Sequence, residues 1–232
     1  ATASGAGISS STNANEATVG INLHSISSGN WNNCASWAYT SNGQPSMVTA
    51  PLSTHDVTIE DGDVIDLNVA GNAKSLILGT AVGAGTLKWT AAADLTIYGS
   101  AGVAVASNGT INHNGQSTAN GIVFSHSAAT TFAFSNAGTV STGTVTCSGA
   151  GGTDLTFSGT LTIALTGYLT NSCASTTITN NNSHVSGLTV GIDYRANAAT
   201  TALVNNSGRK LAIGSNIEFM TGTGNGSSFI ND

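Results

Sequence analysis

The sequence predicts an all-β chain folded as a parallel β-solenoid, and two observations carry this prediction. The first is composition: Thr, Ser, Asn and 29 Gly residues dominate a chain of 232 residues, and all four types are poor helix formers. Only 7% of the residues are charged, against roughly 25% in an average globular protein. The second is a regular alternation of apolar and polar residues, which is typical of half-buried strands.

The alternation runs through most of the chain from Val57 onward. Each apolar pair at i, i+2 spacing places one face of a strand inward, and in several pairs Thr or Lys stands between the two members. Turn residues separate the pairs, so that strands start about every 8 to 11 residues. The apolar sets are Leu76 and Leu78, Leu87 and Trp89, Leu95 and Ile97, Val103 and Val105, Ile122 and Phe124, Phe132 and Phe134, Leu155 and Phe157, Leu161, Ile163 and Leu165, Leu188 and Val190, Leu211 and Ile213, and Ile217 and Phe219.

Strands of this kind favour a solenoid over a pair of β-sandwiches, which is the alternative architecture. They are short and similar along the chain, and no long crossover connection interrupts them. Their outward Thr, Ser and Asn side chains can stack in ladders between coils without charge repulsion. With roughly 20 to 30 residues per coil, we expect about eight to ten coils, and a rod about 40 to 50 Å long at about 4.8 Å per coil.

The chain divides into three zones. Residues 1–20 form a low-complexity extension, residues 21–56 hold Trp31, Trp37 and both Pro residues, and residues 57–232 form the solenoid. The first coil of a solenoid exposes unpaired backbone groups and an apolar cross-section. Because Trp31 and Trp37 are large enough to cover that end, we expect an N-terminal cap. An aromatic platform for sugars is the alternative role of these two rings.

A series of short motifs marks residues 29–78. The motif residues are Gly29, Asn30, Trp31, Trp37, Pro51, Asp56, Val57, Ile59, Gly62, Val64, Ser75, Leu76 and Leu78. This series resembles the opening of secreted bacterial β-helical surface proteins, with a G-N-W element, a second Trp, a Pro-containing loop and a D-x-V-x-I strand. The resemblance implies a right-handed β-helix with a capped N-terminal end, as found in adhesins, surface-layer-like proteins and filaments.

Charge limits the partners that the chain can have. The net charge is −6, with five Lys and Arg residues in all, so no basic stripe is present to neutralise the phosphates of a nucleic acid. The same charge disfavours docking to an anionic membrane, and no apolar run approaches the roughly 18 residues of a membrane span. The composition as a whole leads us to expect an extracellular or cell-surface protein.

The titratable residues are too dispersed to indicate an enzyme. The five His residues lack metal-binding spacing, no nucleophile elbow occurs, and we expect no catalytic residue, cofactor or metal. They are His24, His55, His113, His126 and His184. A polysaccharide lyase or hydrolase is the least favoured function, because the paired Asp residues and neighbouring basic groups of such enzymes are missing.

One acidic cluster stands out between residues 56 and 66. Asp56, Glu60, Asp61, Asp63 and Asp66 offer hard oxygen ligands of the kind that Ca²⁺ binds. The segment matches neither an EF-hand loop nor the glycine-rich nonapeptide repeat. We therefore interpret it as a tight turn whose acids face water, with a calcium site as the weaker candidate.

The three cysteines permit one disulfide bond within the solenoid. Cys147 and Cys173 are 26 positions apart, about one coil, so we predict a bond between adjacent coils worth on the order of 3 kcal/mol. Cys34 would then be left over, buried in the cap or pairing between chains. Three buried free thiols are the alternative.

The leading functional hypothesis is a structural subunit of an extracellular filament or surface layer. An adhesin or a domain that binds cell-surface glycans is the alternative. Residues 1–20 bury too little apolar surface to offset their own ordering entropy. Ile8, Val19, Ile21 and Leu23 would let the N-terminal segment add as a strand to the open end of a neighbouring subunit. Head-to-tail contacts of this kind build polymers; the alternative is that the segment lies along its own rod.

Overall fold

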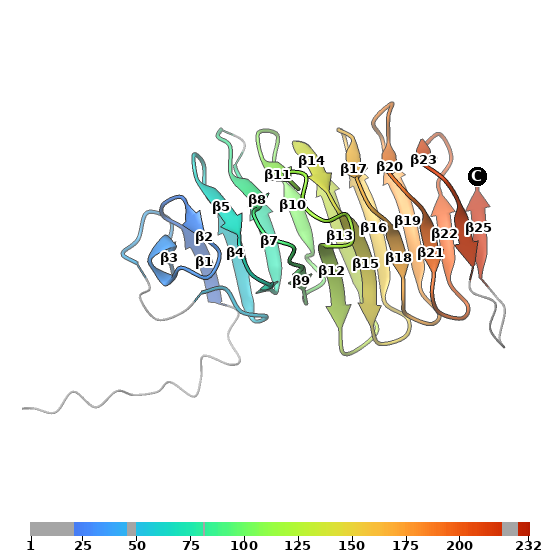
Figure 1. The fold of residues 1–232 in the computed structure, drawn as a ribbon, viewed down its shortest axis with the longest axis horizontal. Coiled ribbons are helices and arrows are strands. Elements are labelled where there is room, and N and C mark those ends of the chain that lie inside the picture. Colours follow the sequence, from blue (N-terminus) through green and yellow to red (C-terminus); the bar gives the residue numbers. More distant parts are fainter. Residues whose placement is uncertain (1–20, 46–49, 81, 220–226) are drawn as a thin grey trace, which may run out of the picture.

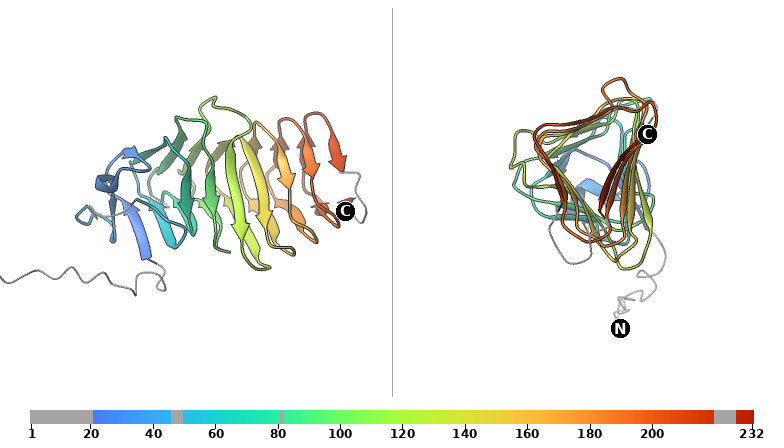
Figure 2. Two further views of the ribbon diagram at one scale, coloured as in Figure 1. Left: turned by 60° about the horizontal axis from the view of Figure 1, so that its bottom comes forward. Right: turned by 90° about the vertical axis from the view of Figure 1, so that its right-hand side faces the viewer.

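The chain is a right-handed parallel β-solenoid in the computed structural model, which describes residues 21–45, 50–80, 82–219 and 227–232 (Figure 1). Successive strands join three sheets in turn, so the described residues form seven complete coils between an incomplete first and an incomplete last coil. Along its axis the rod has a three-sided outline (Figure 2). The described residues contain no α-helix. The predicted all-β solenoid is confirmed.

Three sheets make the three faces of the rod. Sheet A has, in spatial order, β25 (Ser228–Asn231), β22 (Ala202–Asn205), β19 (Thr177–Asn182), β16 (Asp154–Gly159), β13 (Thr131–Asn136), β10 (Val103–Val105), β7 (Ser75–Leu78), β4 (His55–Ile59), β1 (Ile21–Ser25) and β3 (Trp37–Ala38). Sheet B has β2 (Gly29–Asn30), β5 (Val64–Leu67), β8 (Thr86–Trp89), β11 (Thr110–Asn112), β14 (Thr139–Thr142), β17 (Ile163–Leu165), β20 (Leu188–Val190) and β23 (Leu211–Ile213). Sheet C has β24 (Ile217–Phe219), β21 (Tyr194–Ala196), β18 (Leu169–Asn171), β15 (Thr144–Gly149), β12 (Gly121–His126), β9 (Leu95–Ile97) and β6 (Gly71–Ala73).

Coil length varies along the rod. In sheet A, the residues that pair in register between successive coils are Val57, Leu76, Val103, Phe134, Phe157, Asn180, Asn205 and Asn231. Successive members are therefore 19, 27, 31, 23, 23, 25 and 26 positions apart. The extra residues of the longer coils go into the corner loops, since the strands themselves stay in register.

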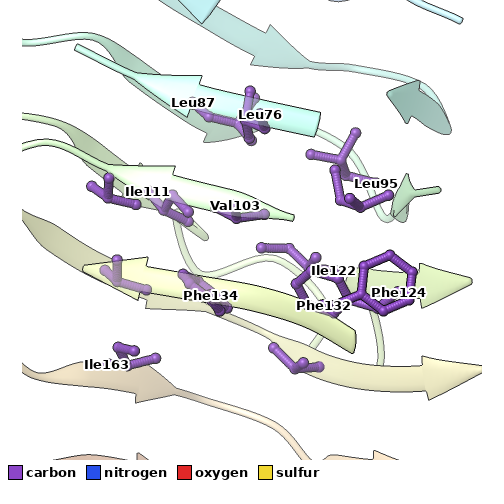
Figure 3. Close-up of a cluster of buried hydrophobic side chains, with 14 of the residues drawn as sticks. Leu76, Leu87, Leu95, Val103, Ile111, Ile122, Phe124, Phe132, Phe134 and Ile163 are labelled. Carbon is purple, nitrogen blue, oxygen red and sulfur yellow. The ribbon is translucent and has the colours of Figure 1, made fainter. Parts of the chain in front are cut away.

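The core is a set of apolar columns that run along the rod axis (Figure 3). Leu76, Val103 and Phe134 are register partners in one column, and each is fully buried. Aromatic rings fill the middle of the rod, where Phe124 and Phe132 lie 5.2 Å apart between ring centroids. Most of the predicted apolar sets face inward as expected. Leu161 is wrong, because it precedes β17 at a corner and is 38% exposed.

Amide side chains replace apolar ones in one column of the later coils. Asn180 and Asn205 occupy the inward positions that continue from Phe157, and both are buried. The amide nitrogen of Asn180 donates to the side-chain oxygen of Asn205, at 2.7 Å, and to the backbone carbonyl of Lys210, at 3.0 Å. Asn205 in turn donates to the side-chain oxygen of Asn231, at 2.7 Å. This asparagine ladder satisfies buried polar groups from one coil to the next.

Candidate functional site: the two ends of the rod

The N-terminal end of the rod is closed by the two tryptophans. Trp31 and Trp37 are buried and lie edge to face, with ring centroids 5.4 Å apart. The indole N–H of Trp37 donates to the backbone carbonyl of Trp31, at 3.0 Å. Their rings complete the apolar cluster that begins with Leu23 and Val57. Within the described residues the two rings fill this end of the apolar core, and burial leaves neither ring available as a platform for sugars.

The same segment covers the edge of sheet A. After Trp31, the short 3₁₀ turn Cys34–Ser36 reverses the chain, and Asn33 accepts a hydrogen bond from the backbone N–H of Ala35 at its start. Strand β3 then pairs antiparallel with β1, the only antiparallel pairing among the described strands. Strand β3 pairs with two of the five residues of β1, so it covers part of this edge.

The last described coil carries core positions that no further described strand covers. Ile217 is the register partner of Tyr194, and Phe229 is the register partner of Leu203. Tyr194 and Leu203 are fully buried, whereas Ile217 is 38% and Phe229 is 40% exposed. The partly buried side chains of β23 complete this surface, which we call the open end: Leu211, Ile213, Ile217, Phe229 and Asn231.

Strand β25 also offers backbone groups and an amide at the open end. The N–H groups of Ser228 and Asp232 donate to carbonyls of the preceding coil, so by strand alternation the N–H and C=O groups of Phe229 and Asn231 point away from it. Asn231 ends the asparagine ladder as an acceptor, and its amide nitrogen has no acceptor among the described residues. The assembly residues predicted from the sequence include none of this strand, although Phe229-x-Asn231 repeats the pattern of Leu203-x-Asn205.

Two of the four residues expected to bind a neighbouring subunit lie in a strand of the chain's own first coil. Ile21 and Leu23 belong to β1, which pairs in parallel with β4 of the same chain, and Leu23 is fully buried. The i, i+2 spacing correctly indicated a strand, but that strand is part of the rod's own first coil. Ile8 and Val19 lie outside the described residues.

The acidic cluster is divided among separate partners. Asp56 binds Lys74 at 2.7 Å, and Glu60 binds His24 at 2.6 Å. The other acids are likewise spread: Asp61 accepts from Thr80, Asp63 accepts from Ser25, and Asp66 pairs in register with Lys88. No group of three or more His, Cys, Asp or Glu side chains in the described ranges could hold a metal ion. Residues 60–63 form the turn between β4 and β5, in which the N–H of Asp63 donates to the carbonyl of Glu60.

The predicted disulfide is not formed. Cys147 and Cys173 are both buried free thiols. The coil that separates them is 24 residues long at this point, because Cys147 pairs in register with Asn171. Cys173 therefore lies two residues beyond the position opposite Cys147. Burial, followed by the neighbouring Cys173, raises the pKa of the Cys147 thiol to about 12.

The remaining candidate groups are dispersed. His113 is buried beside Trp89, and burial lowers its pKa. The Nδ1 atoms of His126 and His184 accept from the backbone N–H groups of Ala128 and Ser186, each two residues further along the same loop. Among the described residues, the exposed aromatic side chains are Tyr39 and Phe229, at opposite ends of the rod. No row of rings for binding a glycan therefore lies along the described sides.

Comparisons of the chain with protein-family models, with curated proteins and with solved structures find no match. The described residues contain no helix with the length and apolar character that crossing a membrane requires.

Proposed function

We propose that the chain is a structural subunit of an extracellular filament or surface assembly, and that subunits join end to end by β-strand pairing at the open end. The observation that carries this function is the exposure of core positions at that end. Phe229 is 40% exposed, while its register partner Leu203 is fully buried. Burying such side chains in a subunit contact is worth about 25 cal/mol for each Å² of apolar surface removed from water.

The composition and the opening motifs support the same function. A surface of hydroxyls and amides, with few charges, suits a rod that stacks without charge repulsion. The resemblance of residues 29–78 to secreted β-helical surface proteins supports an extracellular setting. In the part of the chain that the structure describes, neither a grouped set of titratable side chains nor a row of exposed rings favours the enzyme or the glycan-binding alternative over a structural role.

The test uses one substitution at the open end and one of matched exposure elsewhere. Phe229→Glu places a charge on the open end, and Ile77→Glu places the same charge on the outer face of sheet A, where Ile77 is 44% exposed. Negative-stain microscopy and light scattering of the secreted protein should show end-to-end assemblies for the wild type and for Ile77→Glu. Phe229→Glu should be monomeric with an unchanged β-sheet circular dichroism spectrum. Equal assembly by Phe229→Glu would refute the function.

A further inference from the structure

We infer that Asn114 is a site of spontaneous covalent modification, at which attack by the backbone nitrogen of the next residue converts the side-chain amide to a carboxylate. Gly115 follows Asn114, and the two residues lie in the corner loop between β11 and β12. Water is the only other reactant. The inference concerns the middle of the rod and does not depend on the proposed function.

The reaction takes place within one Asn-Gly pair. The backbone nitrogen of Gly115 gives up its proton to hydroxide and forms a bond to Cγ of Asn114, and the side-chain nitrogen of Asn114 leaves as ammonia. One water molecule then opens the cyclic imide at either of its two carbonyls, which gives aspartate or isoaspartate. Nothing is oxidised or reduced. Glycine favours the attack, because it has no side chain to crowd the ring that forms.

The described residues contain four Asn-Gly pairs, which differ in what the glycine N–H donates to. A nitrogen whose N–H is bonded must first lose that hydrogen bond before it can be deprotonated and approach the side chain, so a bonded pair should react more slowly. The pairs are Asn42–Gly43, Asn108–Gly109, Asn114–Gly115 and Asn120–Gly121. A fifth pair, at 225–226, lies outside the described residues.

Two of the pairs end a turn with their glycine. The N–H of Gly43 donates to the carbonyl of Thr40 at 2.9 Å. The N–H of Gly109 donates to the carbonyl of Ala106, also at 2.9 Å. In both cases the hydrogen bond that closes the turn is made by the nitrogen that would have to attack.

The pair at Asn120 is held at both residues. A carboxylate oxygen of Asp94 accepts from the backbone N–H of Gly121 at 2.9 Å and from the side-chain amide of Asn120 at 3.3 Å. Gly121 is buried and is the first residue of β12. The attacking nitrogen and the leaving amide are therefore both bonded to one acceptor.

Asn114 and Gly115 occupy the centre of their turn instead of its end. The turn is closed by the N–H of Gln116, which donates to the carbonyl of His113 at 3.1 Å. Asn114, with a φ of 54°, and Gly115, with a φ of 67°, are its two central residues, as in a type I′ turn. The N–H of Gly115 has no acceptor among the described residues. Both residues are exposed, and apart from the chain neighbours no atom lies within 4 Å of where a Cβ on Gly115 would be.

The modification changes one contact between coils. The side-chain nitrogen of Asn114 donates to the backbone carbonyl of Trp89, in the preceding coil, at 3.2 Å. A carboxylate in its place has no N–H to donate, so its oxygens and the carbonyl oxygen of Trp89 repel one another. Isoaspartate also adds one carbon to the backbone of a tight turn. We therefore expect the corner loop at 113–120 to loosen from β8 while the sheets stay intact.

Incubation of the native protein at mildly alkaline pH, in water enriched in the heavy isotope of oxygen, tests the site. Peptide mapping by mass spectrometry should show conversion at Asn114 several-fold faster than at the other three described pairs. The heavy oxygen marks conversion during the incubation, and isoaspartate marks the cyclic imide, since direct hydrolysis gives aspartate alone. In protein unfolded by urea the four pairs should react at similar rates, because the hydrogen bonds that distinguish them are lost.

Two variants at the same position complete the test. Asn114→Gln keeps an amide but sets it one bond further from the nitrogen of Gly115, and it should stay unconverted over the same period. Asn114→Asp supplies the product directly and should raise hydrogen exchange in the loop at 113–120 several-fold, with an unchanged β-sheet circular dichroism spectrum. Equal rates at all four pairs in the native protein, or isoaspartate at Asn114 in the unfolded protein alone, would overturn the inference. Unchanged hydrogen exchange in Asn114→Asp would overturn the loosening of the loop.

Discussion

The two ends of the rod face the same physical problem and differ in how far their own chain solves it. Each end leaves an apolar cross-section and an unpaired strand edge. At the N-terminal end, Trp31 and Trp37 fill the cross-section, and β3 pairs with two of the five residues of β1. At the C-terminal end, Ile217 and Phe229 remain partly exposed, and β25 has a partner on one side only among the described strands.

The difference teaches that burial in this fold depends on position along the rod as much as on residue type. Each coil of a solenoid contacts only its neighbours, so an inner coil gains two stacking interfaces and an uncovered coil gains one. Register partners in adjacent coils are therefore matched probes of the two environments. We expect the loss in free energy of unfolding on substitution to be largest at the cap, smaller in the inner coils and smallest at the open end.

The largest effect is expected at the cap. Trp37→Ala removes a buried ring and its hydrogen bond to Trp31, and should lower the free energy of unfolding by about 3 to 5 kcal/mol. Denaturant unfolding followed by circular dichroism measures this loss. Tyr39→Ala, on an exposed residue of the same cap, should change the free energy by less than about 0.5 kcal/mol. Equal losses for the two variants would contradict a cap held by Trp37.

A second pair of substitutions compares an inner coil with the open end. Leu188 is fully buried and is the register partner of Leu211, which is only partly buried. Leu188→Ala should cost about 2 to 5 kcal/mol, and Leu211→Ala should cost less than about half of that in the monomer. In the assembled protein the cost of Leu211→Ala should rise toward that of Leu188→Ala. A cost for Leu211→Ala that does not depend on protein concentration would count against coverage of the open end.

Sequence reasoning captured the parts of the fold that depend on apolar alternation. The sets at Leu76, Leu87 and Leu95 lie on three successive strands, one in each sheet. The architecture followed from these sets, because short repeated strands with uncharged outer faces fit a solenoid. The cap was predicted from the size of the Trp31 and Trp37 rings.

Elements that depend on distant partners could not be predicted in the same way. Strands β19 and β22 bury asparagines, so their hydropathy hides an inward face that only stacked amides make favourable. The spacing of Ile21 and Leu23 indicates a strand but not which chain supplies its partner. The disulfide prediction assumed an average coil length. The local coil has 24 residues, so the residue opposite Cys147 is Asn171 and Cys173 lies two positions beyond it. The exposure of individual core positions on the last described coil could not be predicted, because it depends on which coils stack over them.

A smaller effect is expected from the asparagine ladder. Asn205→Ala leaves the amide of Asn180 without one acceptor and removes the donor to the carbonyl of Arg209, which should cost about 1 to 3 kcal/mol. Asn231→Ala removes an exposed acceptor at the end of the ladder and should cost less than about 1 kcal/mol in the monomer. Unfolding by urea measures both values. An equal cost at the two positions would show that the ladder does not depend on burial.

The smallest effect concerns the thiols, whose chemistry depends on burial within the inner coils rather than on the ends. At pH 8, native protein should react rapidly with a maleimide at the half-buried Cys34 alone, because burial raises the pKa values of Cys147 and Cys173 and blocks access to both thiols. Unfolded protein should label at all three cysteines.

The pKa of Cys147 is about 12 in the folded chain and 9.0 for an ordinary thiol, so the unfolded chain releases this proton first as the pH rises. The thiol's contribution to stability is therefore complete below pH 9 and is lost progressively from there toward pH 12. Mass spectrometry after labelling without reductant counts the thiols, and a single labelled cysteine in the unfolded chain would mean that Cys147 and Cys173 are joined after all.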